Sequence, residues 1–276
     1  MARARRQLED QLRRTDLILE VCDARLPFSS RNPELIRLIG GRQHLLIMNK
    51  TDLADERGTE AWLNAFRADG LRVTGVNGRR LRRDLMLSLI QDATADLVAR
   101  AAERGIRKTV KCMVIGVPNV GKSTLINSLR GTAVAETGDR PGVTKSQQWI
   151  RIHPWLELMD SPGLLWPRLD DQAAARRLCY IGSIRDEAVD LENLTMHLLD
   201  DLAEMEPRCL EDRFHVRDSG KRGLELLDEV CRGRGWLLKG NELDYERACR
   251  VVPDEFRSGK LGRITLEWPK RGRNDD

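Results

Sequence analysis

Apolar and polar residues follow two different rhythms over the first 170 residues of the chain. Short apolar runs rich in β-branched residues predict buried strands. We expect these strands at residues 16–25, 44–53, 71–77, 110–115, 149–153 and 155–160. Apolar residues three and four positions apart predict helices between the strands. We expect these helices at residues 2–14, 35–39, 57–69, 81–104 and 124–130.

Strands and helices that alternate along a chain are typical of an α/β fold in which helices cover both faces of a mostly parallel sheet. The last two strands are separated by Pro154 alone, which predicts a hairpin there. From about residue 172 onward the apolar residues show only helical periodicity. Further helices are expected at 173–182, 187–205, 221–232 and 244–258. The sequence therefore predicts an α/β domain at residues 1–170, followed by a small all-helical domain at residues 171–276.

Composition narrows the class of protein. The chain has 276 residues, of which 41% are apolar and 33% charged, as in a globular protein. Its six cysteines include no C-x-x-C pair, so neither a structural zinc site nor a disulfide framework is indicated. No apolar run reaches the roughly 18 residues that a membrane span needs. The arginine-rich first turns could belong to a transit peptide, but they lead directly into a predicted strand, so we expect a cytoplasmic protein.

The predicted strand at 110–115 leads into GVPNVGKST, residues 116–124, which matches the phosphate-binding pattern G-x-x-x-x-G-K-[ST]. Gly116 and Gly121 permit the tight turn in which backbone N–H groups point at an anionic phosphate, and the N-terminus of the following helix adds positive charge. Lys122 is expected to reach the β- and γ-phosphates, and Ser123 to ligate magnesium. The candidate nucleotide ligands of this loop are Asn119, Val120, Gly121, Lys122, Ser123 and Thr124.

A second group of candidate residues lies at and near the end of the strand at 155–160. Asp160 can bind magnesium through water, the N–H of Gly163 can meet the γ-phosphate, and Thr144 can supply a second hydroxyl to the magnesium. The candidate catalytic residues are therefore Lys122, Thr144 and Gly163. In many GTPases a glutamine follows this glycine and orients the attacking water. Leu164 stands here instead and predicts slow intrinsic turnover.

The predicted strand at 44–53 ends in the base-recognition pattern N-K-x-D. The pattern consists of Asn49, Lys50, Thr51 and Asp52. The Asp52 carboxylate can accept two hydrogen bonds from the N1–H and amino group of guanine, and adenine lacks this donor pair, which argues against the alternative of an ATPase. Lys50 can stack its stem along the base, and Asn49 can connect this loop to the phosphate loop. Asn77 and Gly78 end the third strand, where this fold places a backbone contact to the guanine oxygen.

The order of these motifs differs from that of ordinary GTPases, in which the phosphate loop comes first. Here N-K-x-D at 49–52 precedes the loop at 116–124, so a circularly permuted P-loop G domain is predicted. The segment after Asp160, which moves when the γ-phosphate is lost, then leads directly into the helical domain. A nucleotide-driven switch at 160–170 is therefore expected to re-aim the helical domain as a lever.

Three smaller features leave alternatives open. Asn119 either helps to bind a potassium ion near the phosphates, as in related GTPases, or is required by the loop geometry. Asp23 and Arg25 form either a loop cap or ion pair, or a direct nucleotide contact. Basic residues of the C-terminal part are either RNA contacts or a solvated basic face. The candidates for RNA contacts are Arg222, Arg257, Lys260 and Arg263.

The permuted motif order and several segments resemble the bacterial ribosome biogenesis GTPase A family of the YlqF/RbgA type. The matching segments are DARLPFSSRNP (23–33), GVPNVGKST (116–124), TGDRPGVTKSQQW (137–149), DSPGLLWP (160–167) and FRSGKLGRITLE (256–267). The resemblance covers nearly the whole chain, and the extra zinc-binding or OB-type domains of related permuted GTPases are not expected. It implies a GTPase that binds GTP, GDP and Mg²⁺ and acts late in assembly of the large ribosomal subunit, with the helical domain contacting ribosomal RNA.

Family members usually begin with a short segment containing a Trp-Phe-Pro-Gly-His stretch, before the part that matches residues 1–6 here. This sequence starts at that methionine, either because the start is assigned late or because the segment is missing, so no role in hydrolysis is assigned to that histidine. We expect a monomer that binds the large-subunit precursor and rRNA, is stimulated by that particle, and binds neither membrane nor DNA. The alternative is a GTP-gated RNA-binding placeholder in which hydrolysis is incidental.

Overall fold

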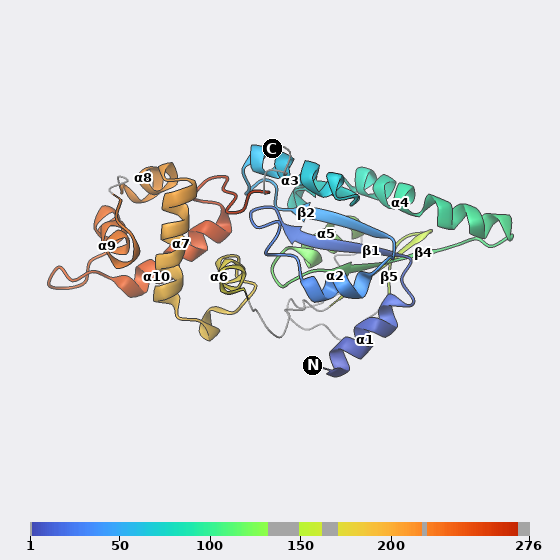
Figure 1. Cartoon of the computed structure of the whole chain (residues 1–276), viewed down its shortest axis with the longest axis horizontal. Coiled ribbons are helices and arrows are strands. Elements are labelled where there is room, and N and C mark those ends of the chain that lie inside the picture. Colours follow the sequence, from blue (N-terminus) through green and yellow to red (C-terminus); the bar gives the residue numbers. More distant parts are fainter. Residues whose placement is uncertain (1, 132–148, 162–170, 217–219, 270–276) are drawn as a thin grey trace, which may run out of the picture.

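A computed structural model describes residues 2–131, 149–161, 171–216 and 220–269. Its centre is a six-stranded sheet with the order β3-β2-β1-β4-β6-β5 (Figure 1). The strands are β1 (Leu17–Asp23), β2 (His44–Asn49), β3 (Val73–Val76), β4 (Val110–Ile115), β5 (Ile150–His153) and β6 (Leu156–Asp160). All neighbours pair in parallel except β5, which pairs antiparallel with β6. The predicted parallel sheet and the predicted hairpin are both confirmed.

Helices cover both faces of this sheet, because side chains along each strand alternate between the two faces. One face carries Ile18 and Cys22 of β1, and it packs against α1 (Ala2–Leu12), α2 (Pro33–Ile39) and α3 (Glu56–Ala68). The opposite face carries Leu17, Leu19 and Val21. It packs against α4 (Arg83–Glu103) and α5 (Lys122–Arg130). Most residues of β1, β2 and β4 are apolar because both faces of these central strands are covered.

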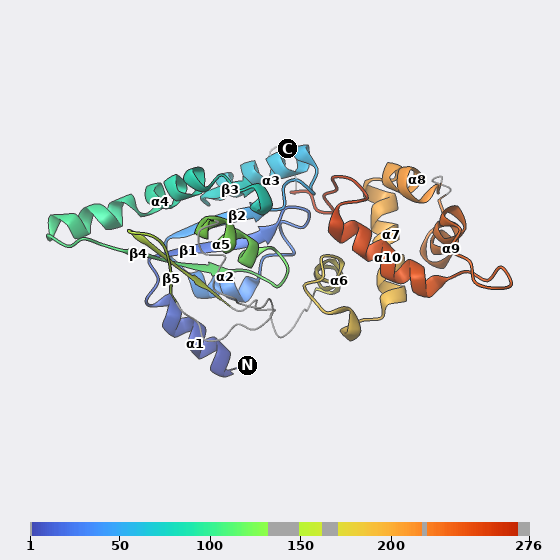
Figure 2. The ribbon, with the colours of Figure 1, turned by 180° about the vertical axis from the view of Figure 1, so that it is seen from behind.

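The remaining helices gather at one end of the molecule and are called the helical part here (Figures 1 and 2). They are α6 (Gln172–Tyr180), α7 (Leu191–Met205), α8 (Arg208–Phe214), α9 (Gly223–Arg234) and α10 (Tyr245–Ser258). The sequence did not predict α8, which is a short helix. It also placed the start of α7 too early, because Asp190 accepts hydrogen bonds from the N–H groups of Glu192 and Asn193 and so caps the helix there.

Residues 261–268 run back from α10 to the sheet, and we call them the return segment. The N–H of Ile264 donates to Leu53 O at 3.0 Å, and the N–H of Leu266 donates to Arg25 O at 3.0 Å. The Trp62 indole in α3 donates to Glu267 O at 2.6 Å. In both views the red ribbon after α10 returns toward α3 (Figures 1 and 2). The helical part is therefore bonded to the sheet through the chain that follows it as well as through the chain that precedes it.

All six cysteines are free and buried. None of the helices in the described ranges combines the length and the apolar character needed to cross a membrane.

Candidate functional site

The phosphate-loop pattern lies between β4 and α5, where two glycines are enclosed by neighbouring atoms. A Cβ added at Gly116 would lie 2.4 Å from Val21 O. A Cβ at Gly121, whose φ is 96°, would lie 2.3 Å from Asn49 Nδ2. A side chain at either position would force the loop away from β1 or from the base-recognition motif. The loop then leads into the first turn of α5, whose N–H groups have no partner within the helix.

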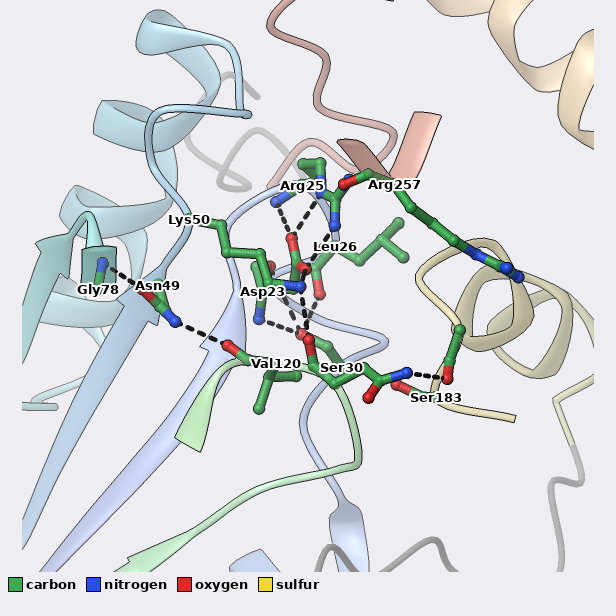
Figure 3. Close-up of polar contacts among 12 residues, drawn as sticks. Asp23, Arg25, Leu26, Ser30, Asn49, Lys50, Gly78, Val120, Ser183 and Arg257 are labelled. Atoms are coloured by element: carbon green, nitrogen blue, oxygen red, sulfur yellow. Dashed lines mark hydrogen bonds and ion pairs between the residues drawn. The ribbon is translucent and has the colours of Figure 1, made fainter. Parts of the chain in front are cut away.

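The base-recognition motif at the end of β2 is bonded directly to the phosphate loop. Asn49 Nδ2 donates to Val120 O at 2.8 Å, and Asn49 Oδ1 accepts from the N–H of Gly78 at 2.9 Å (Figure 3). Lys50 Nζ donates to Asn119 O at 2.5 Å. The structure thus contains the link between the two loops that the sequence predicted at Asn49, and Lys50 adds a second link.

These loops enclose a cleft of about 450 Å³. The predicted site residues that line it are Asn49, Lys50, Asp52, Asn77, Gly78, Asn119, Gly121, Lys122, Ser123 and Thr124. Two other predicted residues, Thr51 and Val120, do not line the cleft. The N–H of Thr51 donates to Val76 O at 3.2 Å, and Val120 is buried in the core. The Asp52 side chain is exposed at the cleft, where a ligand can reach its carboxylate.

The end of the third strand, where a contact to the guanine base is predicted, is bonded to the base-recognition motif. The N–H of Gly78 is bonded to Asn49, and Asn77 Oδ1 accepts from the N–H of Arg79 at 3.0 Å. The Gly78 amide therefore fixes Asn49, while Asn77 and Gly78 both line the cleft, and the backbone contact to a guanine oxygen stays a prediction. The sequence position was adjacent to the cleft, but the direction of the peptide group depends on Asn49, which lies 29 residues away.

The end of β6 brings a carboxylate to the first turn of α5. Ser123 Oγ lies 3.4 Å from Asp160 Oδ2, and Asp160 Oδ1 is buried without a hydrogen-bond partner among the described residues. Burial raises the pKa of Asp160, and the nearby Lys122 partly opposes this shift. A buried oxygen without a partner next to a serine hydroxyl is the donor set that Mg²⁺ accepts, so these residues fit the predicted metal.

Lys122 lies beside this pair and is 7% exposed. Its Nζ donates to Val117 O at 2.9 Å, within the phosphate loop. Burial lowers the pKa of Lys122, and the charge of Asp160 opposes that shift. Burial removes water from the Lys122 ammonium group, and an anion that enters the cleft would stabilise its charge instead. Thr144, Gly163 and Leu164, the other residues predicted to act in hydrolysis, lie outside the described residues.

The sequence left the roles of Asp23 and Arg25 open, and the structure shows a buried ion pair. Arg25 Nη2 lies 2.8 Å from Asp23 Oδ2, and Lys50 Nζ lies 3.0 Å from the same oxygen. Arg25 Nη1 also donates to Phe256 O at 2.9 Å, at the C-terminal end of α10. Asp23 thus connects the lysine of the base-recognition motif to the arginine that holds the last turn of the helical part.

Replacing Asp23 with Asn is expected to lower the free energy of unfolding by about 3–5 kcal/mol at neutral pH, because it leaves the buried Arg25 charge without its partner. Burial alone would raise the pKa of Asp23, but the charges of Arg25 and Lys50 outweigh burial and hold the pKa well below 3.8. The ionised carboxylate therefore stabilises the fold above about pH 4, and this contribution is lost as the pH falls toward the folded-state pKa.

Urea denaturation at several pH values tests this prediction. The difference between the parent protein and Asp23→Asn should shrink as the solution is acidified below about pH 4. Asp92→Asn on α4, where the carboxylate is exposed, is the matched control and should change stability by less than about 0.5 kcal/mol. A difference for Asp23→Asn that does not depend on pH would contradict the ion-pair explanation.

The helical part reaches the cleft through residues that the sequence analysis did not predict there. Ile181 lines the cleft, and so does Arg257, which was predicted as an RNA contact. The guanidinium of Arg257 instead donates to Tyr180 O at 3.0 Å and pairs with Asp186 at 2.7 Å. Arg263, another RNA candidate, donates to Ala54 O at 3.0 Å and to Thr51 O at 3.2 Å. Both arginines thus have partners within the chain. Arg222 and Lys260 have exposed side chains, and the guanidinium of Arg222 donates to Lys221 O at 2.7 Å.

A phosphate loop before α5, a base-recognition motif at the end of β2 and an acidic residue at the end of β6 together define a P-loop GTPase whose motifs are circularly permuted. The strand order supports this class. β1 pairs in parallel with both β2 and β4, so the N-K-x-D motif at the end of β2 and the phosphate loop at the end of β4 lie at the same edge of the sheet, although N-K-x-D comes earlier in the chain.

Comparisons with known proteins agree with this class. The family model described as "50S ribosome-binding GTPase" matches residues 111–220. Ribosome biogenesis GTPase A of Bacillus cereus is 37% identical over 276 aligned residues, which cover 98% of this chain and 92% of the relative. Mitochondrial ribosome-associated GTPase 1 of Ictalurus punctatus is 34% identical, with 97% and 90% covered. The crystal structure of GNP-bound YlqF from T. maritima superimposes with a TM-score of 0.72 at 26% identity, covering 97% of this chain and 99% of that one.

The chain belongs to the ribosome biogenesis GTPase A family. It is accordingly a GTP-binding protein and a GTP hydrolase.

Proposed function

We propose that this GTPase acts in late maturation of the large ribosomal subunit in the cytoplasm, where it binds the subunit precursor and its rRNA through residues 171–276. The names of its relatives support a ribosomal role. The observation that carries the proposal is the shared cleft, because Ile181 and Arg257 of the helical part line it together with Asp52 and Lys122. A helical part that touches the nucleotide cleft can respond to the state of the nucleotide, as an assembly switch requires.

The described residues have separate tasks in the proposed site. Asp52 would read the guanine base, Lys50 would pack along it, and Lys122 would bind the β- and γ-phosphates. Ser123 and Asp160 would hold magnesium, which when bound neutralises charge that develops on the phosphates. Thr144 and Gly163 stay candidate ligands from the sequence pattern.

Asn119 is the proposed contact of a potassium ion. Its Nδ2 donates to Gly182 O, and its backbone φ of 62° lies in the left-handed region. The amide nitrogen of Asn119 is thus used in a hydrogen bond to Gly182. The side-chain oxygen Oδ1 would be the atom that binds the potassium ion. A potassium ion there would add positive charge near the phosphates, which suits a site where Leu164 replaces the usual glutamine.

Rates of GTP hydrolysis with and without large-subunit precursor test the proposal. We expect slow turnover of the isolated protein and stimulation of about tenfold or more by the precursor, since a group supplied in trans can raise turnover by about 10³–10⁵. Stimulation should be larger in potassium than in sodium, and equal rates would remove the potassium ion from the proposal. A precursor that binds the GTP form without stimulating hydrolysis would favour the alternative, a GTP-gated placeholder.

Two variants locate the RNA-binding surface in the same assay. The double variant Arg222→Ala, Lys260→Ala removes two exposed positive charges from the C-terminal part. It should weaken binding to the precursor, more so at low salt, and therefore reduce the stimulation of hydrolysis. Arg107→Ala, an exposed arginine after α4, is the matched control. Stimulation that is lost in the control and kept in the double variant would place the RNA contact elsewhere.

A further inference from the structure

The direction of each peptide group in the phosphate loop determines which groups face a bound phosphate. In a planar trans peptide the C=O of one residue and the N–H of the next point in opposite directions. A donor that holds a loop carbonyl on the outer side therefore aims the following N–H toward the inner side. The donors to these carbonyls consequently belong to the binding site even where they touch no ligand.

Successive carbonyls of the loop are held in this way by side chains from different elements. Lys50 donates to Asn119 O at 2.5 Å and Asn49 donates to Val120 O at 2.8 Å, so the base-recognition motif directs the N–H groups of residues 120 and 121. The carbonyl of Pro118 accepts from Ser183 Oγ at 2.6 Å. The donor that directs the N–H of Asn119 thus comes from the helical part, 65 residues away in the chain.

Ser183 is held firmly enough to act as such a donor. It is 4% exposed, and its N–H donates to Leu178 O at 2.9 Å at the end of α6. Arg257 of α10 also holds the C-terminal end of α6, because its guanidinium donates to Cys179 O at 2.8 Å and to Tyr180 O at 3.0 Å. Figure 3 shows Ser183 approaching the phosphate loop from the side opposite to Asn49. Residues 181–183 and the loop therefore form one bonded unit.

The contact is also reciprocal. Asn119 Nδ2 donates to Gly182 O, next to the bond from Ser183 to Pro118. A Cβ added at Gly182, whose φ is 70°, would lie 3.1 Å from Asn119 Nδ2, so the close approach depends on this glycine.

We propose that Ser183 is a positioning residue for the diphosphate of the bound nucleotide, so that the helical part contributes directly to nucleotide affinity. The inference rests on the proposed nucleotide cleft. It implies that any partner which draws the helical part away from the loop lowers the affinity for both GDP and GTP, by releasing the Pro118–Asn119 peptide group. The hydrogen bonds that carry this coupling are made by residues outside the chain segment 160–170.

Competition against a fluorescent GDP tests the proposal on the full chain. Ser183→Ala is expected to weaken GDP binding about tenfold, the loss of one buried hydrogen bond of about 1.4 kcal/mol. Binding of GMP should change little, because the loop N–H groups hold the β-phosphate that GMP lacks. The ratio of GDP to GMP affinity should therefore fall, and Ser183→Thr, which keeps the hydroxyl, should restore it.

Two further variants separate this role from simple destabilisation and from failure of the site itself. Thr195→Val removes another buried hydroxyl that donates to carbonyls, Leu191 O at 2.7 Å in α7 and Cys249 O at 3.4 Å in α10, but to none of the phosphate loop, so it should leave the affinity ratio unchanged. Lys122→Ala tests the cleft: if it binds GDP normally, the proposed site is wrong. If Lys122→Ala loses GDP while Ser183→Ala keeps the parent ratio, the cleft stands and the role of Ser183 is refuted.

Discussion

Replacing Asp52 with Asn is expected to weaken GTP binding by about a hundredfold or more and to create binding of xanthosine triphosphate. The Asp52 carboxylate lies exposed at the cleft and offers two acceptor oxygens to the N1–H and amino group of guanine. The asparagine amide places a donor where guanine also presents a donor. Xanthine carries a carbonyl oxygen in place of the amino group, so the amide can donate to it while its own oxygen accepts from N1–H.

Competition of GTP, inosine triphosphate and xanthosine triphosphate against a fluorescent nucleotide measures this change. Inosine lacks the amino group and should bind the parent protein less tightly than guanine does. Glu56→Gln is the matched control, because this carboxylate is 84% exposed, lies four residues further along and does not line the cleft. A variant that loses GTP without gaining xanthosine triphosphate would indicate that Asp52 supports the loop and does not read the base.

Replacing Lys122 with Ala is expected to lower the rate of GTP hydrolysis by about 10²–10³, the usual effect of removing one pre-positioned charge from a transition state. The ammonium group is already desolvated and held on Val117 O, so it needs no reorganisation before it meets a phosphate. Because the same group binds the ground-state phosphates, GDP affinity should fall as well.

Single-turnover hydrolysis at saturating GTP, together with GDP affinity, separates the two effects. Lys108→Ala is the control: it removes a lysine whose Nζ lies 2.8 Å from Asp16 Oδ1, in the chain that enters β4, away from the cleft. Hydrolysis at the parent rate in Lys122→Ala would show that another cation performs this task. Thermal unfolding of each variant without nucleotide establishes that the fold is intact.

The sequence alone determined the elements and the local chemistry of the site. Largely apolar runs predicted every strand of the described sheet, because a strand covered on both faces buries most of its side chains. The glycines of GVPNVGKST predicted the loop, because residues 116 and 121 leave no room for a side chain. The order of N-K-x-D and this loop predicted the permutation, which the arrangement of β2, β1 and β4 matches. Each of these signals lies within a short stretch of chain.

Only the tertiary structure decided how the helical part meets the cleft. Arg25 bonds to Phe256 across 231 residues and Ser183 to Pro118 across 65, and neither pair leaves a periodic or spaced pattern in the sequence. The partners of Arg257 and Arg263 were not predicted for the same reason. Composition does not reveal that Arg257 bonds to Tyr180 O and Asp186, or that Arg263 bonds to Ala54 O. Hydrogen bonds to backbone carbonyls require no particular partner residue. Their location is therefore set by how the α10 end and the return segment pack on the sheet, and not by any local sequence signal.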